Sequence, residues 1–133
     1  MAVLLLTPDP MGPFSPAVSS VLDVSVMESL RALGAPGEPD VYTEVALLFL
    51  DDVPIQLAAL SAAIAADSAD SVRQIAHRLR GSALEIGAVR MAPVCAAIEY
   101  AARDGSLEEA AARAESLDLE FVAARETLQL VIQ

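Results

Sequence analysis

The residues best suited to chemistry surround His77, the only histidine in the chain. At helical spacing, Arg73 lies one turn before it, and Arg80 and Gly81 lie one turn after it on the same face. Two guanidinium groups disfavour protonation of an idle imidazole, but they stabilise a dianionic phosphoryl group attached to one. The spacing therefore suggests a histidine that carries a phosphoryl group.

A helical wheel places His77 on the exposed side of its helix. The apolar residues share the opposite arc, which comprises Val72, Ile75, Ala76, Leu79, Ala83 and Ile86. Gly81 lies near His77, although glycine inside a helix costs about 1 kcal/mol relative to alanine. We interpret Gly81 as a gap through which another backbone approaches the imidazole, and Leu84 as an apolar contact beside it. From the residues alone, an idle surface histidine between solvated arginines is an equal alternative.

The apolar spacing predicts one short helix followed by four longer helices, at about 24–33, 41–66, 67 or 70 to 86, 89–103 and 107–131. Gly87 is expected as a left-handed C-cap, and Ser106 with Glu109 as a capping box. Short connections make neighbouring helices antiparallel, so we expect the all-α class. The expected fold is an antiparallel up-down four-helix bundle with a short additional N-terminal helix.

Two segments are expected along the chain. Residues 1–21 hold four of the eight prolines and show no helical period, so they are predicted to be an extended or flexible leader. Residues 22–133 form the predicted bundle domain. The total of 133 residues leaves no room for a nucleotide-binding kinase core beside it.

Composition excludes several classes of function. A net charge of −11 argues against nucleic acid and anionic membrane surfaces, because both require clustered Lys and Arg. The longest uncharged stretch, Val53 to Ala66, is shorter than the roughly 20 residues of a membrane span. A single cysteine, Cys95, allows no internal disulfide and is expected to be a small buried side chain. We therefore expect a cytoplasmic protein.

The segment from Ala76 to Ala88, AHRLRGSALEIGA, resembles the motif A-H-x-L-K-G-S-x-x-x-x-G-A of histidine-containing phosphotransfer (HPt) domains. The likeness extends to Leu48-Phe49-Leu50 upstream and to Cys95-Ala96-Ala97-Ile98-Glu99 downstream, and covers about residues 22–132. The chain departs from the motif at Arg80, where the family usually has lysine. Arginine keeps the charge but is planar and forked, so we expect that Arg80 alters the rate of transfer or the choice of partner.

The resemblance implies a role for each matching residue. His77 would accept a phosphoryl group from the phospho-aspartate of one receiver domain and pass it to an aspartate of another. Arg80 would offset charge on the phosphoryl oxygens, and Gly81 would admit the receiver's loops. The implied partners are response-regulator receiver domains or a hybrid sensor kinase. The carrier would be a monomer with no autonomous kinase activity and no cofactor or metal of its own, since magnesium is expected on the partner receiver.

Geometry adds auxiliary residues to this set. Arg73 is a second electrostatic helper on the helix of His77. The antiparallel helix that follows brings Glu99 and Arg103 near the imidazole, although both are ordinary surface residues in the alternative interpretation. A receiver would dock on an apolar patch, for which Leu84, Met27 and Leu30 are the candidates, with packing as the alternative for the last two.

Two other functions stay open. The chain could be an HPt-like module that binds a receiver or kinase without transferring phosphate. It could also be a helical enzyme in which His77 is a general base, although such a base needs an orienting carboxylate and a concave pocket.

Overall fold

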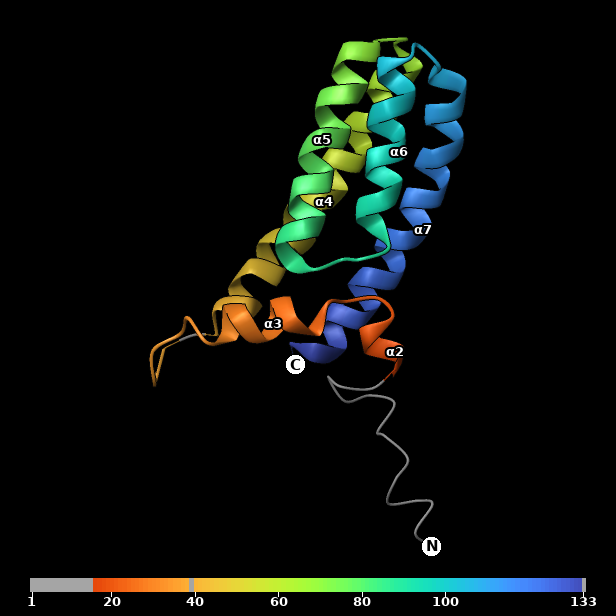
Figure 1. Ribbon diagram of the computed structural model, residues 1–133. Helices are drawn as coiled ribbons and strands as arrows, with labels where there is room; N and C mark the ends of the chain where they lie inside the picture. Colours follow the sequence, from red (N-terminus) through yellow and green to blue (C-terminus); the bar gives the residue numbers. More distant parts are fainter. Residues whose placement is uncertain (1–15, 39, 133) are drawn as a thin grey trace, which may run out of the picture.

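Four long helices pack side by side, each antiparallel to the next along the chain (Figure 1). The computed structural model describes residues 16–38 and 40–132. The bundle consists of α4 (Val41–Ala65), α5 (Ala69–Ile86), α6 (Met91–Arg103) and α7 (Leu107–Val131). Two short helices, α2 (Pro16–Ser19) and α3 (Val24–Arg31), lie across one end. The predicted all-α bundle with a short N-terminal helix is confirmed, and α2 is one further helical turn.

The corners of the bundle are made by residues that begin or end helices. Asp40 begins α4, because its carboxylate accepts a hydrogen bond from the backbone N–H of Tyr42 at 3.0 Å. Gly87 ends α5 with a φ of 82°, which is the predicted left-handed C-cap. Ser106 stands at the N-cap position of α7, but its side chain makes no capping hydrogen bond. The predicted capping box with Glu109 is therefore wrong.

The segment before α3 is tied to the corner between α5 and α6. The backbone N–H of Asp23 donates to the carbonyl of Gly87 at 2.8 Å, and that of Val89 donates to the carbonyl of Val21 at 3.1 Å. A Cβ at Gly87 would lie 3.2 Å from Cβ of Asp23, so glycine is required by this close approach as well as by its φ. The corner that ends the helix of His77 is therefore braced by the N-terminal segment.

This packing corrects the predicted leader of residues 1–21. Over residues 16–21 the chain forms α2 and buries Val18 and Val21 in the core. The sequence showed no helical period there because a single turn is too short to display one. Residues 1–15 lie outside the described part of the chain.

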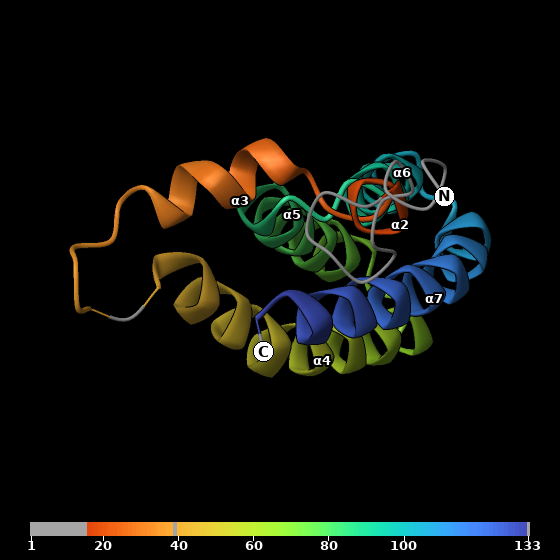
Figure 2. The same cartoon turned by 90° about the horizontal axis from the view of Figure 1, so that it is seen from below.

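The core is made of aliphatic side chains and alanines with few aromatic rings. All six apolar residues predicted to form the inner arc of α5 are buried. Ala102 and Ala110 are among the small residues that allow close helix contact. α4 and α7 run side by side (Figure 2), and the rings of Phe49 and Phe121 meet between them with centroids 5.9 Å apart.

One described helix, α4, is long and apolar enough by length and composition to cross a membrane, and 22% of its most apolar window is buried. The same properties occur in core helices of bundles. In this fold α4 packs against α5 and α7 and buries Phe49, Val53 and Leu60 between them. It also carries Glu44, Asp51 and Asp52. We therefore assign α4 as a bundle helix.

Candidate functional site

His77 stands on the outer surface of α5, as the helical wheel predicts. Its side chain is 67% exposed, whereas Ala76 before it is fully buried. The change between neighbours follows from the 100° turn per residue, which alternates core and solvent around the helix. The imidazole is therefore accessible to a partner, while buried neighbours such as Ala76 hold the backbone of α5 in place.

A carboxylate from the next helix holds the ring. Glu99 of α6 is the buried charged residue of the described chain, with 8% of its surface exposed. Its Oε1 lies 3.0 Å from Nδ1 of His77. Because a carboxylate only accepts hydrogen bonds, Nδ1 must carry the proton in this contact. A neutral ring that donates from Nδ1 has its lone pair on Nε2.

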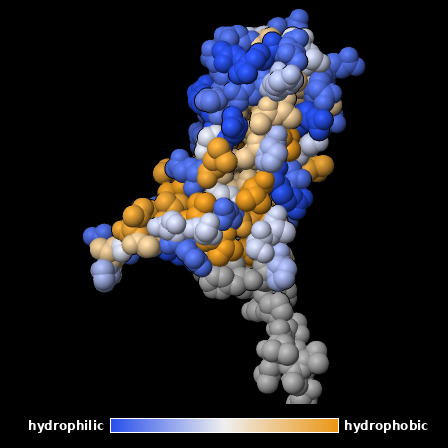
Figure 3. Space-filling view, viewed as in Figure 1, coloured by the Kyte–Doolittle hydropathy of each residue, from blue (hydrophilic) through white to orange (hydrophobic). Residues whose placement is uncertain are grey.

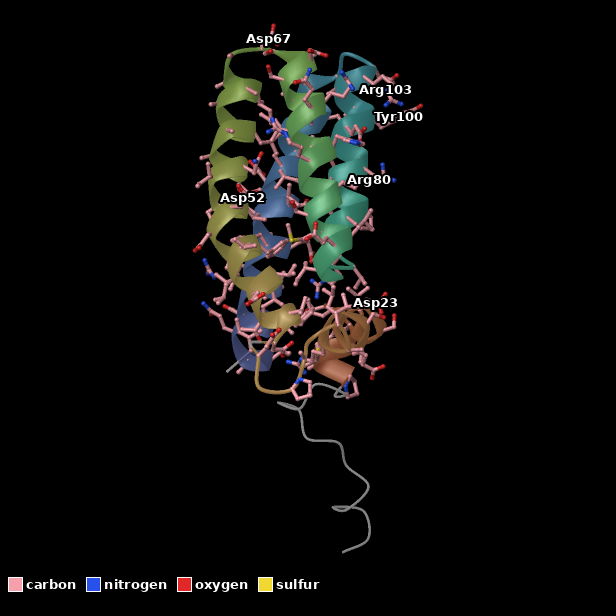
Figure 4. All side chains as sticks on the ribbon, turned by 90° about the vertical axis from the view of Figure 1, so that its left-hand side faces the viewer. Asp23, Asp52, Asp67, Arg80, Tyr100 and Arg103 are labelled. Atoms are coloured by element: carbon pink, nitrogen blue, oxygen red, sulfur yellow. The ribbon has the colours of Figure 1, made fainter. Side chains whose placement is uncertain are left out.

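Two arginines face the same carboxylate from different helices. A guanidinium nitrogen of Arg80 lies 3.7 Å from Oε2 of Glu99, and one of Arg103 lies 3.8 Å from Oε1. Both separations exceed hydrogen-bond distance, and Oε2 is buried without a hydrogen-bond partner in the described chain. Figure 4 shows Arg80 and Arg103 along the edge where α5 and α6 meet. The arginines are held near His77 by charge and make no hydrogen bond to Glu99.

Arg73, the second predicted helper, is engaged elsewhere. Its guanidinium donates to the carboxylate of Asp70 at 2.9 Å, and Gln74 donates to the same carboxylate at 3.0 Å. Arg73 and Arg103 line a shallow hollow of about 320 Å³ beside the start of α5. The structure therefore places Arg73 in the neighbourhood of the site but does not bring it to the imidazole.

Gly81 has no structural reason to be glycine. Its φ is ordinary for a helix, and a Cβ built on it would meet nothing within 4 Å. Gly81 is therefore not needed for close packing against another described helix. What the glycine does is leave the surface open one turn beyond His77.

The three predicted docking residues have different surroundings. Leu84 is 57% exposed and lies two turns beyond His77 on α5. Leu30 is partly buried and packs against the core. Met27 is 1% exposed, so the prediction that it contacts a partner is wrong. Its side chain fills the interface between α3 and the bundle, which is the packing alternative.

Two exposed residues near the site were not predicted from the sequence. Tyr100 follows Glu99 on α6 and is exposed beside Arg103 (Figure 4). Leu48 of α4 is exposed at a hollow of about 310 Å³ between α4 and α5, which Ser82 and Glu85 also line. Figure 3, seen from the side on which α5 and α6 lie in front, shows apolar surface gathered over the lower half of the bundle and mostly hydrophilic surface over the upper half. A wheel for α6 places Tyr100 outward and was the available signal.

Other chemistry is not supported by the described residues. Among them, no group of three or more His, Cys, Asp or Glu side chains could hold a metal ion. Cys95 is buried, as predicted, and burial raises the pKa of its thiol to about 12. The site therefore consists of an imidazole, a carboxylate and two guanidinium groups.

Comparison with known proteins agrees with this geometry. A family profile described as Hpt domain matches residues 44–129. The structure of histidine-containing phosphotransfer protein B (HptB) from Pseudomonas aeruginosa PAO1 is 32% identical, with a TM-score of 0.75 over 81% of this chain and 90% of that one. Among curated protein sequences, none matches the chain at a significant level.

Two plant structures resemble the chain as well. The histidine-containing phosphotransfer protein ZmHP2 from maize is 25% identical, with a TM-score of 0.77 over 86% of this chain and 85% of that one. A putative histidine-containing phosphotransfer protein from rice, at 22% identity and a TM-score of 0.76 over 88% of each chain, shares the fold. The matched region contains α5, α6, most of α4 and α7, and the whole His77 site, and the chain therefore belongs to the Hpt domain family.

Proposed function

We propose that this protein is a phosphocarrier of a multistep phosphorelay, in which His77 takes a phosphoryl group from one receiver aspartate and gives it to another. The observation that carries the proposal is the exposed imidazole of His77, whose Nδ1 is held at 3.0 Å by the buried Glu99. That contact leaves the lone pair of the neutral ring on Nε2. Family membership and the likeness to histidine-containing phosphotransfer proteins support the same reading.

The transfer step needs one nucleophile and no cofactor on this chain. The lone pair of Nε2 attacks phosphorus, and the bond from phosphorus to the receiver's aspartate oxygen breaks. That oxygen leaves with the bonding pair as a carboxylate, and the reverse sequence delivers the phosphoryl group to the next receiver. Magnesium for this step is supplied by the receiver's own carboxylates.

The neighbours of His77 each have a proposed part. Arg80 and Arg103 stabilise the charge on the phosphoryl oxygens, since neither is bound by a hydrogen bond to Glu99. Gly81 admits the receiver's loops, and Leu84 offers an apolar contact for docking. Arg73 contributes only a distant positive charge, because Asp70 holds its guanidinium.

The partners we propose are receiver domains of response regulators or of a hybrid sensor kinase, met in the cytoplasm by a monomeric carrier. The protein acts stoichiometrically and has no kinase activity of its own. The alternative is a docking module of the same fold that binds a receiver without taking its phosphoryl group.

The test is incubation with a labelled phospho-receiver and magnesium. We expect an acid-labile, alkali-stable label on this chain, and none after incubation with ATP alone. Because the chain has a single histidine, a phosphohistidine label can only be on His77. The variant His77→Gln should remain unlabelled while still binding the receiver.

The opposite result is equally clear. If the wild-type protein binds receivers but takes no label from any receiver of its host, the carrier proposal fails and the docking module replaces it.

A further inference from the structure

Glu99 is the buried charged residue of the described chain, and one of its two carboxylate oxygens has no hydrogen-bond partner there. Oε1 accepts from Nδ1 of His77, while Oε2 has no hydrogen bond and faces Arg80 at 3.7 Å. A buried carboxylate without full hydrogen bonding is costly, and an uncharged amide would accept from Nδ1 equally well. The negative charge of Glu99 therefore calls for a reason beyond orienting the ring.

The sum of the charges around the phosphorylated ring gives such a reason. A phosphoryl group brings about two negative charges to Nε2. Arg80 and Arg103 balance these, which leaves the carboxylate of Glu99 facing the ring itself. The site is neutral only if the phosphorylated ring keeps its Nδ1 proton and is therefore a cation.

We propose that Glu99 is a positioning residue that keeps the proton on Nδ1 of His77 throughout the phosphoryl cycle. This inference rests on the proposed role of His77. When Nε2 forms its bond to phosphorus, the ring becomes an N-phosphoryl imidazolium, and its Nδ1–H donates to the Glu99 carboxylate. When the bond between Nε2 and phosphorus breaks, its electron pair returns to Nε2 and restores the neutral ring. No proton enters or leaves in either direction.

The consequence is a phosphohistidine that stays ready to react. The bond from nitrogen to phosphorus in a phosphoryl imidazole breaks easily when the ring is protonated, because neutral imidazole is then the leaving group. Without a stabilising carboxylate the ring loses this proton as pH rises. Glu99 extends the reactive form toward alkaline pH, since an opposite charge at hydrogen-bond distance favours the cation.

The other groups near the ring do not replace Glu99. On α5, Arg80 is cationic and Arg73 is paired with Asp70. On α6, Arg103 is cationic, Tyr100 is exposed, and Cys95 stays a neutral thiol, its pKa raised to about 12 by burial. In the described part of the chain, no hydrogen bond or ion pair joins α4 or α7 to His77 or Glu99.

The test uses protein phosphorylated by phosphoramidate, a small donor that requires no receiver. The lifetime of the label is measured against pH for the wild type, for Glu99→Gln and for the control Glu120→Gln. Glu120 is a matched control because it is a less buried glutamate that is paired with an arginine and, like Glu99, has an Oε2 oxygen without a hydrogen-bond partner in the described chain. At about pH 8 the label on Glu99→Gln should persist about tenfold longer than on the other two, and at about pH 5 all three should agree.

Nitrogen-15 NMR of the single histidine gives an independent measurement that needs no variant. In the phosphorylated wild type at about pH 8, the ring should show a proton on Nδ1 and a phosphoryl group on Nε2. Absence of that proton overturns the inference. So do lifetimes of Glu99→Gln that match the wild type at every pH, or that differ by one constant factor, as a merely structural change would produce.

The two proposals fail in different ways. A wild type that takes up phosphoramidate label with the expected pH profile, but none from receivers, defeats the relay function and leaves the role of Glu99 intact. A wild type that is not labelled by phosphoramidate at all overturns the free Nε2 on which this inference depends.

Discussion

The interface between α6 and α7 and the interface between α5 and α6 use the same residue types in opposite ways. Between α6 and α7, Nε of Arg90 lies 2.7 Å from Oε2 of Glu120, and Nη2 donates to Oε1 at 3.1 Å. Between α5 and α6, Glu99 faces Arg80 and Arg103 at 3.7 and 3.8 Å. In both sets the Oε2 oxygen of the glutamate has no hydrogen-bond partner in the described chain. The sets differ in the arginines: Arg90 donates a hydrogen bond to its carboxylate, whereas Arg80 and Arg103 donate none to Glu99, and we call this second set open.

The difference separates a structural ion pair from a prepared site. A guanidinium that forks onto a carboxylate has few donors left for another anion. The arginines around Glu99 keep theirs, and they stand beside an exposed ring whose free nitrogen needs compensating charge once it is phosphorylated. A carboxylate whose arginines do not hydrogen-bond to it contributes less to the free energy of unfolding. Such a cluster becomes favourable when an anionic group binds to the arginines.

Replacing the open arginines should produce the largest effect. We expect Arg80→Gln and Arg103→Gln together to slow transfer from a phospho-receiver by about a hundredfold, because two charge-stabilising donors are lost. The free energy of unfolding should change by less than about 0.5 kcal/mol, since both side chains are largely exposed. Stopped-flow or quench measurement of label transfer, with urea unfolding alongside, checks both.

The matched control for this prediction is Arg90→Gln. It removes one arginine from the same bundle, with the same change of charge, and should leave the transfer rate within about twofold because its partner is Glu120. If Arg90→Gln slows transfer as much as the open arginines do, overall charge governs the rate and the contrast between the interfaces disappears.

Gly81→Ala should separate stability from function. A methyl group there meets nothing within 4 Å, so the variant should be more stable by about 1 kcal/mol through helix propensity. Transfer from a receiver should nevertheless slow by roughly tenfold, because that methyl group occupies the space needed by the partner's backbone. Thermal unfolding and label transfer measure the two quantities, and unchanged transfer would show that no partner approaches so closely.

The sequence predicted those features that depend on a single helix. The periodicity of α5 placed His77 outward and its apolar arc inward, and Gly87 ended the helix as expected. The same reasoning from one helix predicted that both Arg73 and Arg80 would lie beside His77 and stabilise a phosphoryl group. It could not show that Asp70, three residues before Arg73, would bind the guanidinium first.

Features that depend on two helices were harder to predict. The contact between His77 and Glu99 requires the register of α6 against α5, which is set by the corner at Gly87 and by side chains that reach across. Met27 was a docking candidate with packing as the alternative, because an eight-residue helix shows too little pattern to identify its buried face. The N-terminal turn at α2 was missed for a similar reason.

Leu84→Ala tests whether the apolar part of the exposed face contributes to docking. We expect the affinity for a receiver to fall by about threefold to tenfold, as truncation of one apolar contact at the rim of an interface gives. Leu119→Ala is the matched control, since Leu119 is an even more exposed leucine on α7. Titration calorimetry with the receiver distinguishes them, and equal affinities for the two variants would remove Leu84 from the docking surface.

The smallest effect should come from the same substitution made in each interface. Glu120→Gln breaks a close ion pair and should cost about 0.5–1 kcal/mol of unfolding free energy, a loss that shrinks in high salt because the pair is partly exposed. Glu99→Gln removes a more deeply buried charge whose two arginines lie 3.7 and 3.8 Å away, so it should cost less or even stabilise the fold. Urea unfolding at low and high salt measures both. A larger stability loss for Glu99→Gln than for Glu120→Gln would mean that the carboxylate of Glu99 holds α5 to α6, and that the open interface is structural after all.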